Sequence, residues 1–183
     1  MVIILFLCCC SCAKDTIKDT IRENQLNVYL TGSSKYILLP PGNIENPLDM
    51  AQQISASYKG GDYFLNAWVK ADETGMEMTF LNELGARMGE LSYRNGQASF
   101  SSPVFPSSLK PEYIVADFQF CFYNTIALRK ALKDCGLSFE DTGNSRRILQ
   151  GKTLVIEIEK KPDTVRLVNH LRGYTYTLEG NFL

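Results

Sequence analysis

The segment from Pro103 to Gly136, PVFPSSLKPEYIVADFQFCFYNTIALRKALKDCG, separates two series of short strand-like segments. It is the one part of the chain in which apolar residues recur at helical rather than alternating spacing. A helical insert between two runs of strands is typical of an α+β protein. This segment therefore sets the predicted architecture.

The first helix of the insert is predicted to begin at Pro111-Glu112. The missing N–H of proline is harmless at a first helical position, and an early carboxylate suits the positive helix end. Four apolar residues follow at helical spacing: Ile114, Val115, Phe118 and Phe122. With a period of two, Phe118, Phe120 and Phe122 fall on one side instead, so a strand remains an alternative.

The second predicted helix is capped by Asn124, whose side chain can accept hydrogen bonds from the first free backbone amides. Its apolar stripe lies at positions i, i+3, i+4 and i+7 and consists of Leu128, Ala131, Leu132 and Cys135. Gly136 ends this helix, because glycine adopts the left-handed conformation of a helix C-terminus without steric cost.

Alternating apolar and polar residues predict nine or ten short strands around the insert. Those before it cover residues 52–58, 63–71, 76–81, 87–94 and 97–101, and those after it cover 137–140, 146–150, 153–159, 164–170 and 174–179. Tight turns, of which Asn95-Gly96 is a strong hairpin signal, join the four or five strands before the insert in meander order. We expect one large, curved antiparallel β-sheet whose concave face is covered by the helical insert.

The N-terminus carries a targeting signal. Val2–Leu7 is an apolar run far shorter than the ~20 residues of a membrane-spanning helix, but it has the length found in secretory signals. Ser11-Cys12 and a polar stretch follow, which resembles a bacterial lipoprotein signal with Cys12 as the lipidated residue. Cys10 is the alternative acceptor. An ordinary cleaved signal and a cysteine-rich metal tract also remain open.

These features predict residues 1–12 as signal and lipidation site, 13–35 as a polar tether and 36–183 as a single domain. The tether contains the imperfect repeat KDTIKDTIRE, for which a short helix is the alternative structure. In an exported domain, Cys121 and Cys135 could form a disulfide or remain small buried side chains.

Charge and motifs argue against nucleic acid, metal and catalysis. The formal net charge of -1 gives no electrostatic footprint for nucleic acid. The pairs Arg146-Arg147 and Lys160-Lys161 are expected to be solvated and to face apart on strands. The single histidine is His170, and the adjacent carboxylates Glu140-Asp141 would also face apart. No nucleotide-binding, hydrolase or metalloprotease motif occurs, so we expect no enzyme and no cofactor.

A family resemblance rests on four motifs: Leu38-Leu39-Pro40-Pro41, Leu81-x-x-Leu84-Gly85-x-x-x-Gly89, Tyr113-Ile114-x-Ala116-Asp117-x-Gln119 and Gly173-Tyr174. In this order they resemble an uncharacterised family of bacterial outer-membrane lipoproteins encoded beside the enzymes that make aryl-polyene pigments. The resemblance covers Tyr36 to Leu183, with Phe122-Tyr123 where the family is tryptophan-rich. It implies a half-barrel similar to LolA and LolB, which carry lipoproteins across or into the outer membrane, and a location facing the periplasm.

Two functions remain in competition. In the first, the envelope protein binds or transfers a hydrophobic ligand, an acyl, polyene or lipoprotein acyl chain, between sheet and helices. In the second, it is a lipid-anchored adaptor that docks partner proteins of the envelope. A surplus of bulky apolar residues, including adaptable methionines, favours the first.

The predicted ligand-binding residues are Phe64, Trp68, Met76, Met78, Phe80, Asp117, Phe118, Phe120 and Phe122, with Asp117 as a polar anchor at the mouth of the site. If the residues on the strands line a cavity, they indicate a carrier. If they pack solidly under the helices, they indicate an adaptor.

Overall fold

The computed structural model describes residues 25–107 and 109–182. The predicted signal, the lipidation site Cys12 and the first part of the tether lie outside them. The described elements are β1 (Asn27–Tyr29), β2 (Lys35–Ile37), η1 (Pro41–Asn43), β3 (Leu48–Tyr58), β4 (Gly61–Asp72), β5 (Gly75–Leu81), β6 (Arg87–Arg94), β7 (Gln97–Ser101), α2 (Pro111–Phe122), α3 (Thr125–Asp134), β8 (Ser138–Asp141), β9 (Ser145–Gln150), β10 (Thr153–Lys160), β11 (Thr164–Asn169) and β12 (Tyr174–Glu179).

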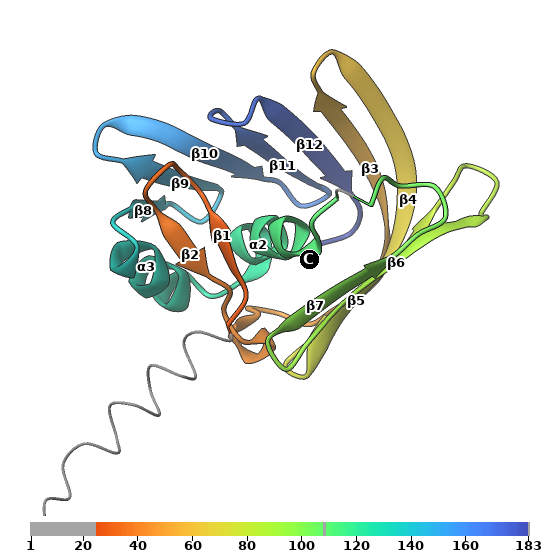
Figure 1. The fold of residues 1–183 in the computed structure, drawn as a ribbon, viewed down its shortest axis with the longest axis horizontal. Coiled ribbons are helices and arrows are strands. Elements are labelled where there is room, and N and C mark those ends of the chain that lie inside the picture. Colours follow the sequence, from red (N-terminus) through yellow and green to blue (C-terminus); the bar gives the residue numbers. More distant parts are fainter. Residues whose placement is uncertain (1–24, 108, 183) are drawn as a thin grey trace, which may run out of the picture.

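One antiparallel sheet holds ten of these strands, in the order β7-β6-β5-β4-β3-β12-β11-β10-β9-β8. Each half is a meander of consecutive strands, as the turn signals predict for the first half. The halves join where β12 pairs with β3, from Tyr174 opposite Tyr58 to Glu179 opposite Gln53. The sheet stays open between β7 and β8, and Figure 1 shows it curving around α2. The chain is therefore an α+β protein with a curved antiparallel sheet.

The central insert forms the two expected helices. α2 spans Pro111–Phe122, so the alternative strand is wrong, and α3 spans Thr125–Asp134. The Asn124 side chain accepts hydrogen bonds from the amides of Ile126 and Ala127, as predicted for an N-cap. Gly136 follows α3 with a φ of 80°.

The helices do not share one position. Figure 1 places α2 inside the curve of the sheet, where it contacts β7 and β11, whereas α3 packs against β8 and β2 at one edge. The expectation that the whole insert covers the concave face is therefore correct for α2 alone. The two helices lie in different places because the chain breaks at Tyr123, whose extended backbone (φ -90°, ψ 159°) turns the chain out of α2.

The last residues of the expected tether, from Gln25 onward, are folded. β1 and β2 form a hairpin that packs its inner side chains, Val28, Leu30, Tyr36 and Leu38, into the core. β1 lies against α2, and β2 lies against α3. The signal was present as the alternation of Leu26, Val28 and Leu30, but three-residue strands give too short a pattern to recognise.

The hydrophobic core lies on the concave face. Alternate residues of the strands point into it and meet the buried side of α2, which includes Val115, Phe118 and Phe120. The described core side chains, the sheet and both helices lie within residues 25–182. A chain that begins at Gln25 therefore retains all of these described parts.

We predict that Leu128→Ala lowers the free energy of unfolding by about 2–5 kcal/mol, because the Leu128 side chain is fully buried in the apolar stripe of α3. The matched control is Ile126→Ala on the same helix. Ile126 is 76% exposed, so its truncation should change the free energy by about 0.5 kcal/mol or less. Chemical denaturation of both variants measures the difference. Equal effects would show that α3 does not pack on the sheet.

Candidate functional site

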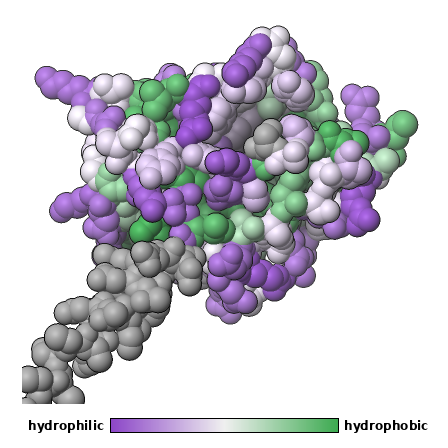
Figure 2. Space-filling view, in the orientation of Figure 1, coloured by the Kyte–Doolittle hydropathy of each residue, from purple (hydrophilic) through white to green (hydrophobic). Residues whose placement is uncertain are grey.

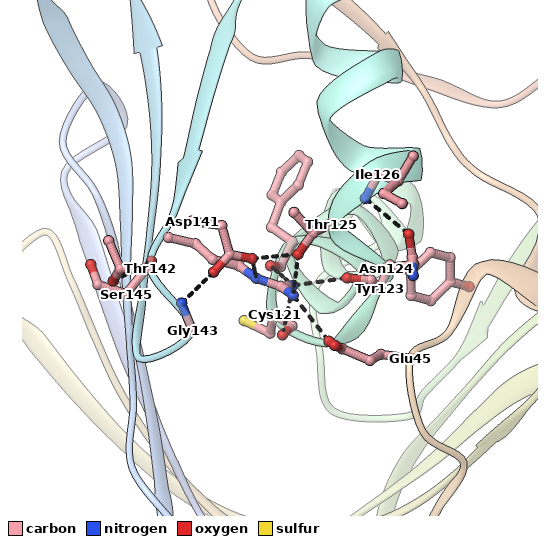
Figure 3. A network of polar contacts seen from close by, with 12 residues as sticks. Glu45, Cys121, Tyr123, Asn124, Thr125, Ile126, Asp141, Thr142, Gly143 and Ser145 are labelled. Carbon is pink, nitrogen blue, oxygen red and sulfur yellow. Dashed lines mark hydrogen bonds and ion pairs between the residues drawn. The ribbon is translucent and has the colours of Figure 1, made fainter.

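The most connected polar residue is Arg146, which is only 2% exposed. Its Nη1 donates to the carbonyl oxygens of Phe120, Cys121 and Tyr123 at 2.9–3.1 Å, where α2 ends. Its Nε donates to Asp141 at 2.9 Å, and its Nη2 lies 3.1 Å from Glu45 Oε2. Figure 3 shows these acceptors converging from the end of α2, the end of β8 and the segment before β3 that holds Glu45.

This network neutralises the buried guanidinium through Asp141. Burial raises the pKa of the Asp141 carboxyl, but the Thr125 hydroxyl, the Gly143 amide and Arg146 outweigh it and hold the pKa below its ordinary value. The pair therefore stabilises the fold at neutral pH and loses its effect as the pH falls through that lowered pKa. Every hydrogen-bonding group of Arg146 is used within the protein, so we assign it a structural role.

The expectation that Arg146-Arg147 would be solvated is thus wrong for Arg146. The two side chains do face apart, and Arg147 lies on the outer face, 3.3 Å from Glu140. The pairing of β9 with β10 aligns Arg146 with Ile158 and Ile148 with Ile156, all of them buried. The alternation with Ile148 was the available signal that Arg146 points inward.

A second buried contact fixes the chain before β3 onto α2. The Gln119 side chain accepts hydrogen bonds from the Tyr36 hydroxyl and the Leu39 amide, and its Nε2 donates to the Leu39 carbonyl oxygen at 2.8 Å. The Tyr93 hydroxyl donates to the same oxygen at 2.9 Å. Two of the motifs behind the family resemblance, those of Leu39 and Gln119, are therefore in direct contact.

The predicted ligand-binding residues do not form one site. Five of them are buried within the packed core, at 7% exposure or less: Met76, Met78, Phe80, Phe118 and Phe120. Phe122 is partly buried and stacks on Phe182. Phe64 and Trp68 lie on the outer face, 68% and 51% exposed, and cannot line the space between sheet and helices. Trp68 Nε1 donates to Asp49 on that outer face.

Part of the concave face is left open. On β3, β4 and β12 the inward side chains near the β3–β4 turn are only partly covered or exposed, whereas Gln52, Ala67 and Leu178, farther along the same strands, are buried. Tyr63, for example, is 54% exposed. We call this surface the open strip, and it consists of Ile54, Tyr58, Tyr63, Leu65, Tyr174 and Tyr176. Figure 2 shows the surface hollowed near the centre of the view.

α2 borders the open strip through three contacts at regular spacing. The Arg172 guanidinium stacks on the Tyr113 ring at 4.3 Å, the Tyr174 hydroxyl donates to Asp117 Oδ2 at 2.7 Å, and Cys121 Sγ lies 4.0 Å from the Tyr176 hydroxyl. Four helical residues rise about 6 Å and two strand residues about 6.6 Å, so these positions stay in register. Long side chains from the β12 segment thus reach α2 beside the open strip.

Asp117 is the predicted residue that does meet this surface. Burial raises the pKa of its carboxyl to about 7, although the hydrogen bond from Tyr174 and the charge of Arg172 act in the opposite direction. The carboxyl is therefore mostly protonated below pH 7 and mostly ionised above it. The tyrosines of the strip were missed because their exposure depends on where α2 lies, although alternation along β3 and β12 places them on the inner face.

One buried amide at the inner end of the strip lacks a partner. Gln52 precedes Ile54 on the inner face of β3 and is 3% exposed, and no described residue accepts a hydrogen bond from its Nε2. A buried donor without a partner costs roughly 1–3 kcal/mol. A ligand or water oxygen beside Ile54 would remove that cost.

Two recesses lie at the other end of the sheet. One of about 710 Å³ is lined by residues that include Leu38, Pro41 and Tyr93, and one of about 380 Å³ by residues that include Ile44 and Asp72. Neither recess is lined by a predicted ligand-binding residue or by the open strip.

Other candidate chemistry is sparse over the part of the chain that the structure describes. No cluster of three His, Cys, Asp or Glu side chains there could hold a metal ion. Cys121 and Cys135 are not paired, and burial raises the pKa of Cys121 to about 12. His170 is exposed, with its Nε2 3.8 Å from Glu157. None of the described helices has both the length and the apolar character needed to cross a membrane.

These observations define a class of protein: an open, curved antiparallel sheet that holds one helix inside its curve and leaves an aromatic strip beside that helix. A family model described as protein of unknown function (DUF3261) matches residues 49–180. The chain belongs to this family, and the match includes the helical insert and both halves of the sheet. No curated protein matches the chain.

We predict that Arg146→Leu lowers the free energy of unfolding by about 3–5 kcal/mol, because it leaves Asp141 and three carbonyl oxygens without their buried donor. Arg147→Leu, at the neighbouring position on the outer face, should cost about 1 kcal/mol or less. Urea denaturation at neutral pH compares the two. A small effect at Arg146 would mean that the junction of α2 and α3 holds without it.

Proposed function

We propose that the protein binds or transfers a hydrophobic ligand, an acyl, polyene or lipoprotein acyl chain, on the open strip beside α2, without catalysing a reaction on it. The observation that supports this proposal is a difference in side-chain exposure along one face of the sheet. Ala67 and Val69 on β4 are buried, whereas Leu65 and Tyr63 on the same face of that strand are increasingly exposed. Partly exposed apolar side chains next to a polar group are typical of ligand-binding surfaces.

The open geometry of the sheet supports this function. A curved sheet with a helix inside it can hold an elongated chain along its strands, and the open strip extends along β3 and β4. The tyrosines of the strip combine apolar rings with hydroxyl groups, which suits a ligand with a long apolar chain and a polar end. The sequence motifs resemble lipoproteins encoded with aryl-polyene enzymes, and this resemblance implies a LolA- or LolB-like fold and the same ligand class.

Binding is tested with a conjugated tetraene chain that ends in a hydroxyl and becomes fluorescent in an apolar site, added to the chain from Gln25 onward. Tyr63→Asp should weaken binding by about tenfold or more, because it places a charge on the open strip. Phe64→Asp is the matched control. Phe64 is the next residue of β4, is more exposed and lies on the outer face, so its change should leave the affinity of the probe unaltered.

The second candidate function is that of a lipid-anchored adaptor that docks partner proteins of the envelope. The exposure of Phe64 and Trp68 on the outer face of β4 favours it, and so does the solid packing of Met76, Met78 and Phe80. The same experiment separates the two. Absence of saturable binding by the folded chain would favour the adaptor over the carrier. Loss of binding in Phe64→Asp alone would move the ligand from the open strip to the outer face.

We also propose that the chain is anchored by acyl chains at Cys12, in the outer membrane and facing the periplasm. Cys12→Ala should release the protein from membranes, because two or more acyl chains, at about 0.8 kcal/mol per buried CH₂, account for stable anchoring. Membrane fractionation and the intact mass of the mature chain test this. Cys10→Ala is the control, and retention of Cys12→Ala with loss of Cys10→Ala would move the acceptor to Cys10.

A further inference from the structure

The polar groups beside the open strip indicate which head group it would accept. We propose that the strip selects apolar ligands that end in a hydrogen-bond donor, an amine or a hydroxyl, over ligands that end in a carboxylate, and that Asp117 is the acceptor. This inference rests on the proposed function and specifies its ligand. It follows from the direction of the hydrogen bonds around Asp117 and from the charges near it.

Successive hydrogen bonds all point toward Asp117. The backbone amide of Arg172 donates to Asn169 Oδ1 at 2.9 Å, and Asn169 Nδ2 donates to the Tyr174 hydroxyl oxygen at 3.2 Å. The Tyr174 hydroxyl then donates to Asp117 Oδ2 at 2.7 Å. The hydroxyl proton of Tyr174 is thus already used. Asp117 is the terminal acceptor of the chain, and no described residue donates a hydrogen bond to its Oδ1.

The positive charge near Asp117 belongs to Arg172, whose guanidinium interacts directly with other residues. Arg172 is the cation that acts on the carboxyl, but its guanidinium stacks on Tyr113 and donates to the Tyr29 carbonyl oxygen at 2.7 Å. It makes no hydrogen bond to Asp117. A carboxylate ligand placed at Oδ1 of Asp117 would therefore meet an acceptor rather than a donor. A ligand ammonium or hydroxyl could instead donate a hydrogen bond to that oxygen.

Three other ionisable groups that face this site, two tyrosines and a cysteine, are neutral at physiological pH. Burial raises the pKa of Tyr174, Tyr176 and Cys121 well above their ordinary values. The charge of Lys160 on β10 acts on Cys121, and the cation that acts on Asp117 is Arg172. The charge of the site thus depends on Asp117 and Arg172. Because burial raises the pKa of Asp117 to about 7, selectivity should change across neutral pH.

The test uses three fluorescent probes that share one conjugated tetraene chain and end in a carboxylate, a hydroxyl or an amine. Each is titrated into the chain from Gln25 onward at about pH 6 and pH 8, on either side of the Asp117 transition. At the higher pH, the amine should bind about tenfold or more tightly than the carboxylate. At the lower pH, that ratio should shrink as Asp117 gains its proton, and the hydroxyl probe should change little.

Asp117→Asn is the decisive variant, because it keeps the shape and one acceptor oxygen but removes the charge. It should bind the hydroxyl probe within about threefold of the unmodified protein and lose the preference for amine over carboxylate. Asp49→Asn is the matched control, since it removes the same charge from a carboxylate on the outer face of the sheet, away from the open strip. It should retain the preference. The change of the amine-to-carboxylate ratio between the two pH values in the unmodified protein tests the inference where Asp117→Asn does not fold.

Two results would overturn the inference while leaving the proposed function intact: equal or tighter binding of the carboxylate probe at the higher pH, or an amine preference that persists in Asp117→Asn. A third result, loss of the preference in Asp49→Asn with Asp117 present, would also overturn it. If none of the three probes binds the folded, unmodified chain, the proposed function itself fails. The two failures are therefore distinguishable.

Discussion

The hydrogen bonds from Arg146 to the carbonyl oxygens of Phe120, Cys121 and Tyr123 fix where α2 ends. The last carbonyl groups of a helix lack intrahelical partners, and here a strand supplies the donor that satisfies them. The same guanidinium reaches Asp141 and Glu45, so the sheet, the junction of the helices and the segment before β3 meet at one side chain. The rest of α2 is positioned from this fixed end.

The other end of α2 is held by contacts of a different kind. Near the Arg146 end the helix is packed by fully buried apolar side chains, such as Phe120 against Tyr36. Toward Tyr113, the segment around β12 is connected through long polar side chains, and the strip between α2, β3 and β4 stays partly open. One sheet face thus combines a packed half with a surface that could receive a ligand without loss of core contacts.

The strands and helices could be predicted because each has a local signal. Alternation gave β6, β7 and β12 with their observed bounds, and the proline and asparagine signals gave the starts of α2 and α3. The side-chain environments could not be predicted in the same way. Phe64 and Met78 are both bulky residues on adjacent strands, yet one is exposed and the other buried, because alternation places them on opposite faces and the sequence does not say which face α2 covers.

The environments of polar residues were even harder to predict from the local sequence. A strand arginine is usually solvated, and Arg146 is buried because unpaired carbonyl groups of a distant segment lie opposite it. Asp117 stood out in the sequence as a carboxylate among apolar residues, but its partner Tyr174 lies 57 residues away. A buried polar residue acquires its role from groups that the fold brings to it. Arg146 has all of its donors occupied and acts in the fold, whereas Asp117 retains an oxygen that no described residue donates to, and this difference separates a structural polar group from a candidate binding group.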